Sequence, residues 1–241
     1  MTVFTTKLLA IIIPIAPDET QWQQLCHDFA LLPQATEVIF VIAKGHDIDI
    51  HPIIERFPRL TIKLIRSVQG RAQQLNAGAL AANNPYLWFL HADSRLTQHN
   101  IDALLNAIKR PSANQGLFYF DLYFYDKASK WLTLNEWGAK LRSNWLGIPF
   151  GDQGFAIEHK LFKQLGCYDI TAPFGEDHLL VWQAKLQHVK CYPLGSPLAT
   201  SARKYQQYGW LNLSWRYQIL WPKQAWPHFK KLLAHRLLQS K

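Results

Sequence analysis

The sequence predicts an α/β fold in which helices flank a mostly parallel central sheet, with a C-terminal helical tail after it. Short apolar runs alternate with amphipathic or Ala-rich segments through the first half of the chain. This alternation is typical of repeated strand–helix–strand units. The 241 residues are 49% hydrophobic and 18% charged, which suits one globular domain with an appendage.

The expected elements follow this rhythm. Strands are predicted at 7–13, 37–43, 61–65 and 86–91, with helices at 18–31, 70–82 and 97–109 and a short helix or turn at 51–57. The pattern then changes to an aromatic strand at 116–125 and helices at 128–146, 158–165 and 175–187, with a GDQG loop at 151–154. Acidic residues near the start of the 18–31 segment suit the dipole of a helix N-terminus.

The net charge of +9 indicates an anionic partner, such as nucleic acid, acidic lipid or a phosphate-bearing substrate. Cys26, Cys167 and Cys191 are too widely spaced for a metal cluster or a disulfide framework. They favour reduced thiols and a cytoplasmic location. The apolar run at 8–13 is far shorter than the roughly 20 residues that span a bilayer, and we expect no signal peptide.

The tail at 206–241 differs from the rest of the chain in its composition. It contains Trp210, Trp215, Trp221 and Trp226, and it places Trp226, Phe229, Leu233 and Leu237 near one helical face with Lys223, Lys230, Lys231, Arg236 and Lys241 around them. Such a helix suits peripheral contact with an anionic membrane surface. The same stripe equally suits a helix docked on the body of the protein.

Four groups of polar residues stand at predicted turns. Asp93 ends the strand within NPYLWFLHADSRL, where it is either a helix cap or a ligand at the sheet edge. Gly70-Arg71 opens a helix and suits a phosphate, or is an ordinary helix start. Asp152-Gln153 lies between glycines, as in a tight turn, and Glu176-Asp177 either answers a helix dipole or supplies a general base.

The order of these motifs is more specific than any one of them. The runs GRAQQLNAGA, LWFLHADSRL, LGIPFGDQGFAI, FGEDHLLVW and TSARKY resemble family 2 glycosyltransferases, closest to the radical-SAM/selenodomain-associated transferase 2 subgroup. The resemblance implies a GT-A, or nucleotide-diphospho-sugar transferase, fold over 1–205, with a nucleotide-binding half at 1–96 and an acceptor-side half at 97–205. It also implies sugar transfer from a nucleotide-diphosphate donor with Mg²⁺ or Mn²⁺.

The resemblance assigns roles to particular residues. Asp177 matches the general base, Glu176 orients it or contacts the acceptor, and Asp93 matches the metal ligand. The donor-binding residues by this resemblance are Gly70, Arg71, Asn76, Asp93, Arg95 and Arg203, and those on the acceptor side are Asp152 and Gln153. We expect inversion at the anomeric carbon and an acceptor that is lipid-linked or near a membrane.

Three departures keep other functions open. Ile42 stands where relatives have a nucleoside-binding aspartate, Pro17 interrupts the motif after the first strand, and Ser94-Arg95 follows Asp93 without a second carboxylate. These favour a degenerate, non-catalytic GT-A domain as the alternative. A nucleotidyltransferase fits the sheet but not the Glu-Asp motif, and nucleic acid is not an expected partner because the basic residues are dispersed.

Overall fold

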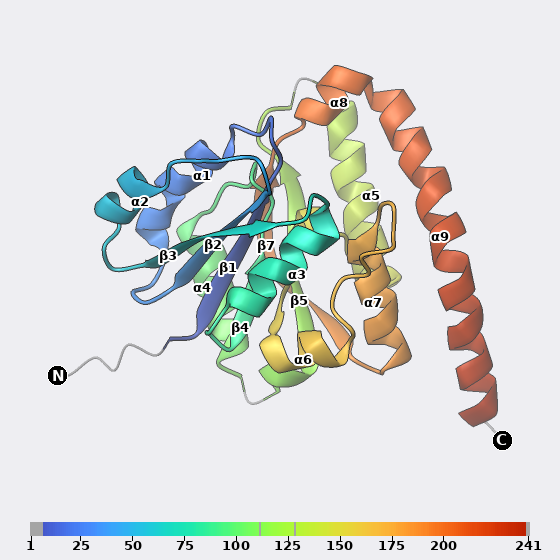
Figure 1. Cartoon of the computed structure of the whole chain (residues 1–241). Coiled ribbons are helices and arrows are strands. Elements are labelled where there is room, and N and C mark those ends of the chain that lie inside the picture. The colour runs from blue at the N-terminus through green and yellow to red at the C-terminus, as the bar shows by residue number, and fades with distance from the viewer. Residues whose placement is uncertain (1–6, 111, 128, 240–241) are drawn as a thin grey trace.

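The computed structural model describes residues 7–110, 112–127 and 129–239 and contains one seven-stranded sheet (Figure 1). The strands are β1 Leu9–Ile15, β2 Glu37–Ala43, β3 Thr61–Ser67, β4 Tyr86–Phe89, β5 Gly116–Phe124, β6 Ala156–Glu158 and β7 Lys190–Thr200, in the order β3-β2-β1-β4-β6-β5-β7. Strands β1 to β4 are parallel, and β6 runs antiparallel to both β4 and β5. The prediction of a mostly parallel sheet is confirmed.

One face of the sheet is covered by α1 Trp22–His27, α2 His51–Arg56 and α4 Gln98–Ile108. The 3-10 turn Asp28–Leu31 replaces the second half of the helix predicted at 18–31. Side chains from alternate strand positions, such as Ile11 and Phe40, pack on this face against Phe29 and Leu104. The period of two along each strand therefore divides the core into two layers.

The opposite face is covered by α3 Arg71–Ala81, α6 His159–Gln164 and α7 Glu176–Leu186. Gly78 of α3 sits against β1, where an added Cβ would lie 2.5 Å from the Ile12 side chain. Helix α5 Trp131–Trp145 forms a smaller cluster with the end of β5 through Leu132 and Ala139. The helices predicted at 70–82, 97–109, 128–146 and 175–187 are thus present with shifted ends.

Two strands were not predicted from the sequence. β7 contains Pro193, Gly195 and Pro197, residues that weaken a strand pattern. The strand is at the sheet edge, where its only strand partner in the described chain is β5, apart from an isolated bridge between Ala199 and Arg95, so its prolines leave few ladder bonds unmade. β6 has three residues and directly follows the GDQ turn, which makes it too short to give a periodic signal.

The chain ends in α8 Arg203–Tyr208 and the long α9 Trp210–Gln239 (Figure 1). Helix α9 is docked on α7: Trp182 and Phe229 meet edge to face at 6.3 Å, and Ala225 is buried. Trp226 and Leu233 nevertheless remain exposed. The side chains of Trp210, Arg236 and Leu237, and Lys241 as a whole, lie outside the described residues. No helix in the described part of the chain is long and apolar enough to cross a membrane.

Candidate functional site

A cavity of about 450 Å³ opens at the carboxyl ends of β4, β5 and β7, between α5, α7 and α9. Ligands of α/β sheets commonly bind at this edge. The polar residues that line the cavity are Arg71, His91, Asp93, Asn135, Arg142, Asp152, Glu176, Asp177, His178, Thr200, Ser201 and Lys204. Five residues predicted from distant segments of the sequence, namely Arg71, Asp93, Asp152, Glu176 and Asp177, therefore share one cavity.

Asp177 is fixed by two backbone donors at the start of α7. Its Oδ2 accepts a hydrogen bond from the Gly151 N–H at 2.5 Å, and its Oδ1 accepts one from the His178 N–H at 2.8 Å. Gly151 allows this approach, because a Cβ there would lie 2.8 Å from Arg71 Nη2 and 2.9 Å from Asp177 Oδ2. The GDQ turn and the Glu-Asp motif are thus one structural unit.

Arg71 begins α3 and connects this unit to the end of β4. Its Nε lies 3.1 Å from Glu176 Oε1, and its guanidinium also donates to the His91 ring. Burial raises the pKa of Glu176, and the charge of Arg71 opposes that shift. Burial and the charge of Arg71 hold the pKa of His91 well below its usual value, so the imidazole is neutral.

Asp93 lies beyond the end of β4, where its Oδ1 accepts a hydrogen bond from Thr200 Oγ1 at 3.2 Å. His91 Nδ1 lies 4.0 Å from the same oxygen. Burial, with the charge of Glu19 adding to it, raises the pKa of Asp93. A nearby divalent cation would offset the cost of burying the charged carboxylate, because it favours the ionised form.

Of the four carboxylates that line the cavity, Asp93 is the one that the resemblance assigns to a metal ion. Within the described residues, no three or more His, Cys, Asp or Glu side chains are grouped so as to hold a metal ion. Mg²⁺ commonly uses one or two carboxylates, keeps several waters and takes its other oxygens from substrate phosphates. Asp93 therefore fits a metal ion that is shared with a diphosphate, and not a site made by the protein alone.

The two residues of the GDQG motif have different surroundings. Asp152 Oδ1 is buried and has no hydrogen-bond partner among the described residues, and burial raises the pKa of Asp152. Gln153 is fully buried and does not line the cavity. Its Oε1 accepts from Ser143 Oγ at 2.8 Å, and its Nε2 donates to the Phe120 carbonyl at 2.9 Å. Gln153 thus joins α5, the turn and β5.

Four other predicted residues do not line the cavity. Gly70 precedes α3 with a φ of 136°, and Asn76 exchanges hydrogen bonds with the Tyr168 backbone at 2.8 and 3.0 Å. Arg95 is held by two hydrogen bonds to Asp28 at 2.7 and 2.8 Å, and Arg203 pairs with Glu19 Oε2 at 2.6 Å. Their polar groups bind to the protein itself, and their predicted donor contacts stay predictions.

Two cations of the cavity were not among the predicted site residues. Lys204 follows Arg203 in TSARKY and lines the cavity, so the motif signalled a cation one position away. Arg142 comes from α5, and its guanidinium lies 3.5 Å above the Phe150 ring. No local pattern marks Arg142, because only the packing of α5 against the GDQ turn brings it to the cavity.

The end of β2 is apolar at the position where the resemblance leads us to expect an aspartate. Ile42 is buried in the core. Asp47, five residues later, forms an exposed ion pair with Arg66 at 2.6 Å. In this conformation neither residue offers an unpaired carboxylate for a nucleoside.

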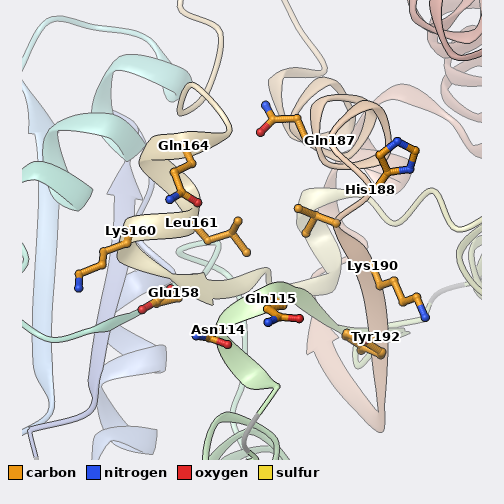
Figure 2. A pocket seen from close by; sticks show the side chains of 11 residues that line it. Asn114, Gln115, Glu158, Lys160, Leu161, Gln164, Gln187, His188, Lys190 and Tyr192 are labelled. Atoms are coloured by element: carbon orange, nitrogen blue, oxygen red, sulfur yellow. The ribbon is translucent and has the colours of Figure 1, made fainter. Parts of the chain in front are cut away.

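A second hollow of about 630 Å³ lies at the opposite ends of β5 and β7 (Figure 2). It is lined by Asn114, Gln115, Glu158, Lys160, Leu161, Gln164, Gln187, His188, Val189, Lys190 and Tyr192. None of the predicted site residues borders it. The cavity at the carboxyl ends is therefore the candidate site, although it is the smaller of the two.

Comparisons with solved structures identify the fold. The chain superposes on a mannosyltransferase from Pyrobaculum calidifontis, solved with GDP-Man and Mn²⁺, with a TM-score of 0.65 and 16% identity over 85% of this chain. It superposes on a fragment of S. aureus TarS with a TM-score of 0.63 and 14% identity over 80% of this chain. The chain spans 60% of each of these two structures.

These likenesses confirm the GT-A-like fold, and the sequence itself shows the family. No curated protein matches the chain in sequence. Residues 30–166 match glycosyl transferase family 2, a stretch that covers more than half of the chain and runs from β2 through α6. That stretch contains Arg71, Asp93 and Asp152 of the cavity. The chain therefore belongs to glycosyl transferase family 2.

Proposed function

We propose that this protein transfers a sugar from a nucleotide-diphosphate donor to an acceptor hydroxyl, with inversion at the anomeric carbon. One observation carries the proposal: Asp177, Arg71 and Asp93 meet in a single cavity at the carboxyl edge of the sheet. This combination supplies a base, a cation and a metal-binding carboxylate, which are the groups that such a transfer needs.

Asp177 is the general base of the proposed reaction. It takes the proton from the acceptor hydroxyl as that oxygen bonds to the anomeric carbon, and the bond from this carbon to the donor phosphate breaks with its electrons on the diphosphate. The backbone N–H groups of Gly151 and His178 fix the orientation of the carboxylate. Arg71 holds Glu176 beside it and, with Lys204, places positive charge near the departing diphosphate.

A bound Mg²⁺ or Mn²⁺ would neutralise part of the charge of the departing diphosphate, and Asp93 would hold it. Asp152, with an unpartnered carboxyl oxygen, supplies the acceptor side of the cavity. The similar structures were solved with GDP-Man and with UDP-GlcNAc, so guanosine and uridine donors are the first to test. Buried Ile42 implies that the base is held by contacts other than the usual aspartate.

The finer expectations from the sequence stay with this proposal. They are membership of the radical-SAM/selenodomain-associated transferase 2 subgroup, a lipid-linked acceptor, and a cytoplasmic enzyme that contacts the membrane through its 206–241 tail. A single catalytic domain at 1–205, with a nucleotide-binding half at 1–96 and an acceptor-side half at 97–205, is likewise proposed. The alternative is a degenerate GT-A domain that binds nucleotide or a partner without turnover, which buried Ile42 favours.

A thermal-shift panel tests the proposal. UDP, GDP, CDP, ADP and dTDP are each added with and without Mn²⁺. A ligand present at about 100 times its dissociation constant stabilises the folded state by roughly 2.7 kcal/mol, which is measurable. We expect a metal-dependent shift with one nucleotide and hydrolysis or transfer of the corresponding sugar. A nucleotide-dependent shift without any donor turnover would favour the non-catalytic domain over the transferase. The absence of a shift with every nucleotide would overturn both the transferase and the nucleotide-binding domain.

A further inference from the structure

Helix α5 leaves a stripe of large apolar side chains in solvent. Trp131, Trp137 and Trp145 have relative exposures of 59%, 66% and 84%, and Leu134 and Leu141 lie between them along the helix. Leu132, Ala139 and Ser143 are its buried residues and pack on the opposite side. Single exposed apolar residues are common, but a contiguous stripe of three tryptophans and two leucines marks an interaction surface.

Helix α9 has a second stripe of this kind. Leu211, Trp215, Ile219, Trp226 and Leu233 recur at helical spacing and are exposed. The residues that dock α9 on the body recur along a different side of the helix, and they are Trp221, Ala225, Phe229 and Leu232. Docking therefore leaves part of the apolar surface of α9 exposed, because one side of the helix packs on the protein and another side faces solvent.

The charge around these stripes is positive. No Asp or Glu follows Asp177, whereas Lys223, Lys230 and Lys231 lie exposed along α9. Lys230 Nζ lies 5.4 Å from the centroid of the Trp226 ring, so cation and aromatic ring share one patch. Exposed Lys130 precedes the α5 stripe. Aromatic anchors with neighbouring lysines suit the interface of an anionic lipid bilayer.

We propose that the exposed stripes of α5 and α9 together bind an anionic lipid surface. A second copy of this chain is a poorer occupant, because a symmetric pair would place the lysines of both α9 helices in one interface. The proposal adds α5 to the contact expected for the tail alone.

Helices α5 and α9 also border the candidate cavity, so their binding to lipid would decide where an acceptor can approach. Leu134 and Arg142 of α5 and Leu220 and Trp221 of α9 line the catalytic cavity (Figure 1 shows both helices). Binding through these helices therefore brings the cavity close to the lipid headgroups. This step rests on the proposed function: an amphiphilic acceptor keeps its apolar chain in the bilayer and presents its hydroxyl to Asp177.

Vesicle co-sedimentation of the whole chain tests the proposal. The vesicles contain either equal parts of phosphatidylglycerol and phosphatidylcholine or phosphatidylcholine alone, and no nucleotide is present. The test variant combines Trp137→Ser and Trp145→Ser. The matched control combines Val68→Ser and Leu80→Ser, whose side chains are 62% and 78% exposed and lie far from both stripes in sequence. A third variant combines Lys223→Glu and Lys230→Glu.

We expect the wild type and the control to bind anionic vesicles and not phosphatidylcholine alone, with binding that weakens as salt rises. The tryptophan and lysine variants each bind at least about tenfold more weakly. Failure to bind anionic vesicles, or full binding by the tryptophan variant, would overturn the proposal. A dimer in solution that the tryptophan variant abolishes would assign the surface to a second copy instead. Nucleotide thermal shifts on the same variants report separately on the proposed function.

Discussion

Two sets of polar residues come from the same motifs, but one set lines the cavity and the other is hydrogen-bonded within the protein. Arg71, Asp93 and Asp177 line it. Asn76 and Arg95, which share the same two predicted motifs with Arg71 and Asp93, direct their polar atoms to Tyr168 and Asp28 instead. The comparison teaches that a motif locates a site to within a few residues, while the partner of each side chain decides whether it is available to a ligand.

The largest expected effect tests the first set. Asp177→Asn keeps the shape of the side chain and removes its basicity, so we expect turnover to fall by roughly 10²-fold or more. Nucleotide binding should persist, because the change leaves Arg71 and Asp93 in place. The measurement is donor consumption at saturating nucleotide sugar, with the thermal shift by nucleotide as the check on binding.

The control for this variant is Asp169→Asn. Asp169 is an exposed carboxylate that accepts hydrogen bonds from Thr171 and lies outside the cavity. The Asp169→Asn substitution removes one carboxylate from the same part of the chain and leaves the residues of the cavity unchanged. The turnover of this variant should match that of the wild type. Undiminished turnover in Asp177→Asn would remove the assigned role of the base.

The same contrast explains what the sequence could and could not predict. The parallel strands β1 to β4 were predictable because they are short apolar runs bounded by turn signals, and helices follow them in a regular alternation. β7 was missed because Pro193 and Pro197 are tolerated only at an edge, and edge position is a property of the assembled sheet. Arg142 was missed for a similar reason, since tertiary packing alone places it.

Gln153 is a residue that the motif marked as part of the site but that the structure places in the core. Its place in GDQG indicated a group that contacts the acceptor, but the structure buries it completely. Its amide is held by Ser143, Phe150 and Phe120. A short polar motif at a turn is compatible with a ligand contact and with an internal brace, and only the partners distinguish them.

Separate substitutions of Asp93 and Arg95 compare a residue that lines the cavity with a neighbour that is paired within the protein. Asp93→Ala should weaken Mn²⁺-dependent nucleotide binding by about tenfold or more, because it removes the carboxylate that we propose as the metal ligand. Arg95→Ala, two residues away, should leave nucleotide affinity unchanged. It should lower the free energy of unfolding by about 1 kcal/mol, because its pair with Asp28 is partly exposed.

Nucleotide titration followed by thermal shift, with and without Mn²⁺, measures the first effect, and urea unfolding measures the second. Weakened nucleotide binding in Arg95→Ala at unchanged stability would place Arg95 in the donor site after all. Metal dependence that survives in Asp93→Ala would show that another oxygen ligand holds the ion.

The smallest expected effect concerns Asp152, whose buried Oδ1 has no partner in the described structure. Asp152→Asn removes the cost of burying that charge, and we expect it to raise the free energy of unfolding by about 1 kcal/mol at neutral pH. We also expect it to slow turnover through the acceptor side, so that stability rises as activity falls. Urea unfolding and donor consumption measure the two changes.

The pH dependence of this gain has a definite sign. Burial raises the pKa of Asp152 above the unfolded value of 3.8, so the folded state binds the proton more readily than the unfolded state does. The wild type therefore loses stability as the pH rises from 3.8 through the raised pKa of the folded state. Above that pKa the advantage of the Asn variant is greatest, and it shrinks as the pH falls toward 3.8. The charges of Asp177 and Asp93 add to the rise in the pKa of Asp152, so the Asn variant also relieves their repulsion at high pH. An advantage that grows on acidification would show that the Asp152 carboxylate is stabilised by Arg142 and Arg71 more than it is destabilised by burial.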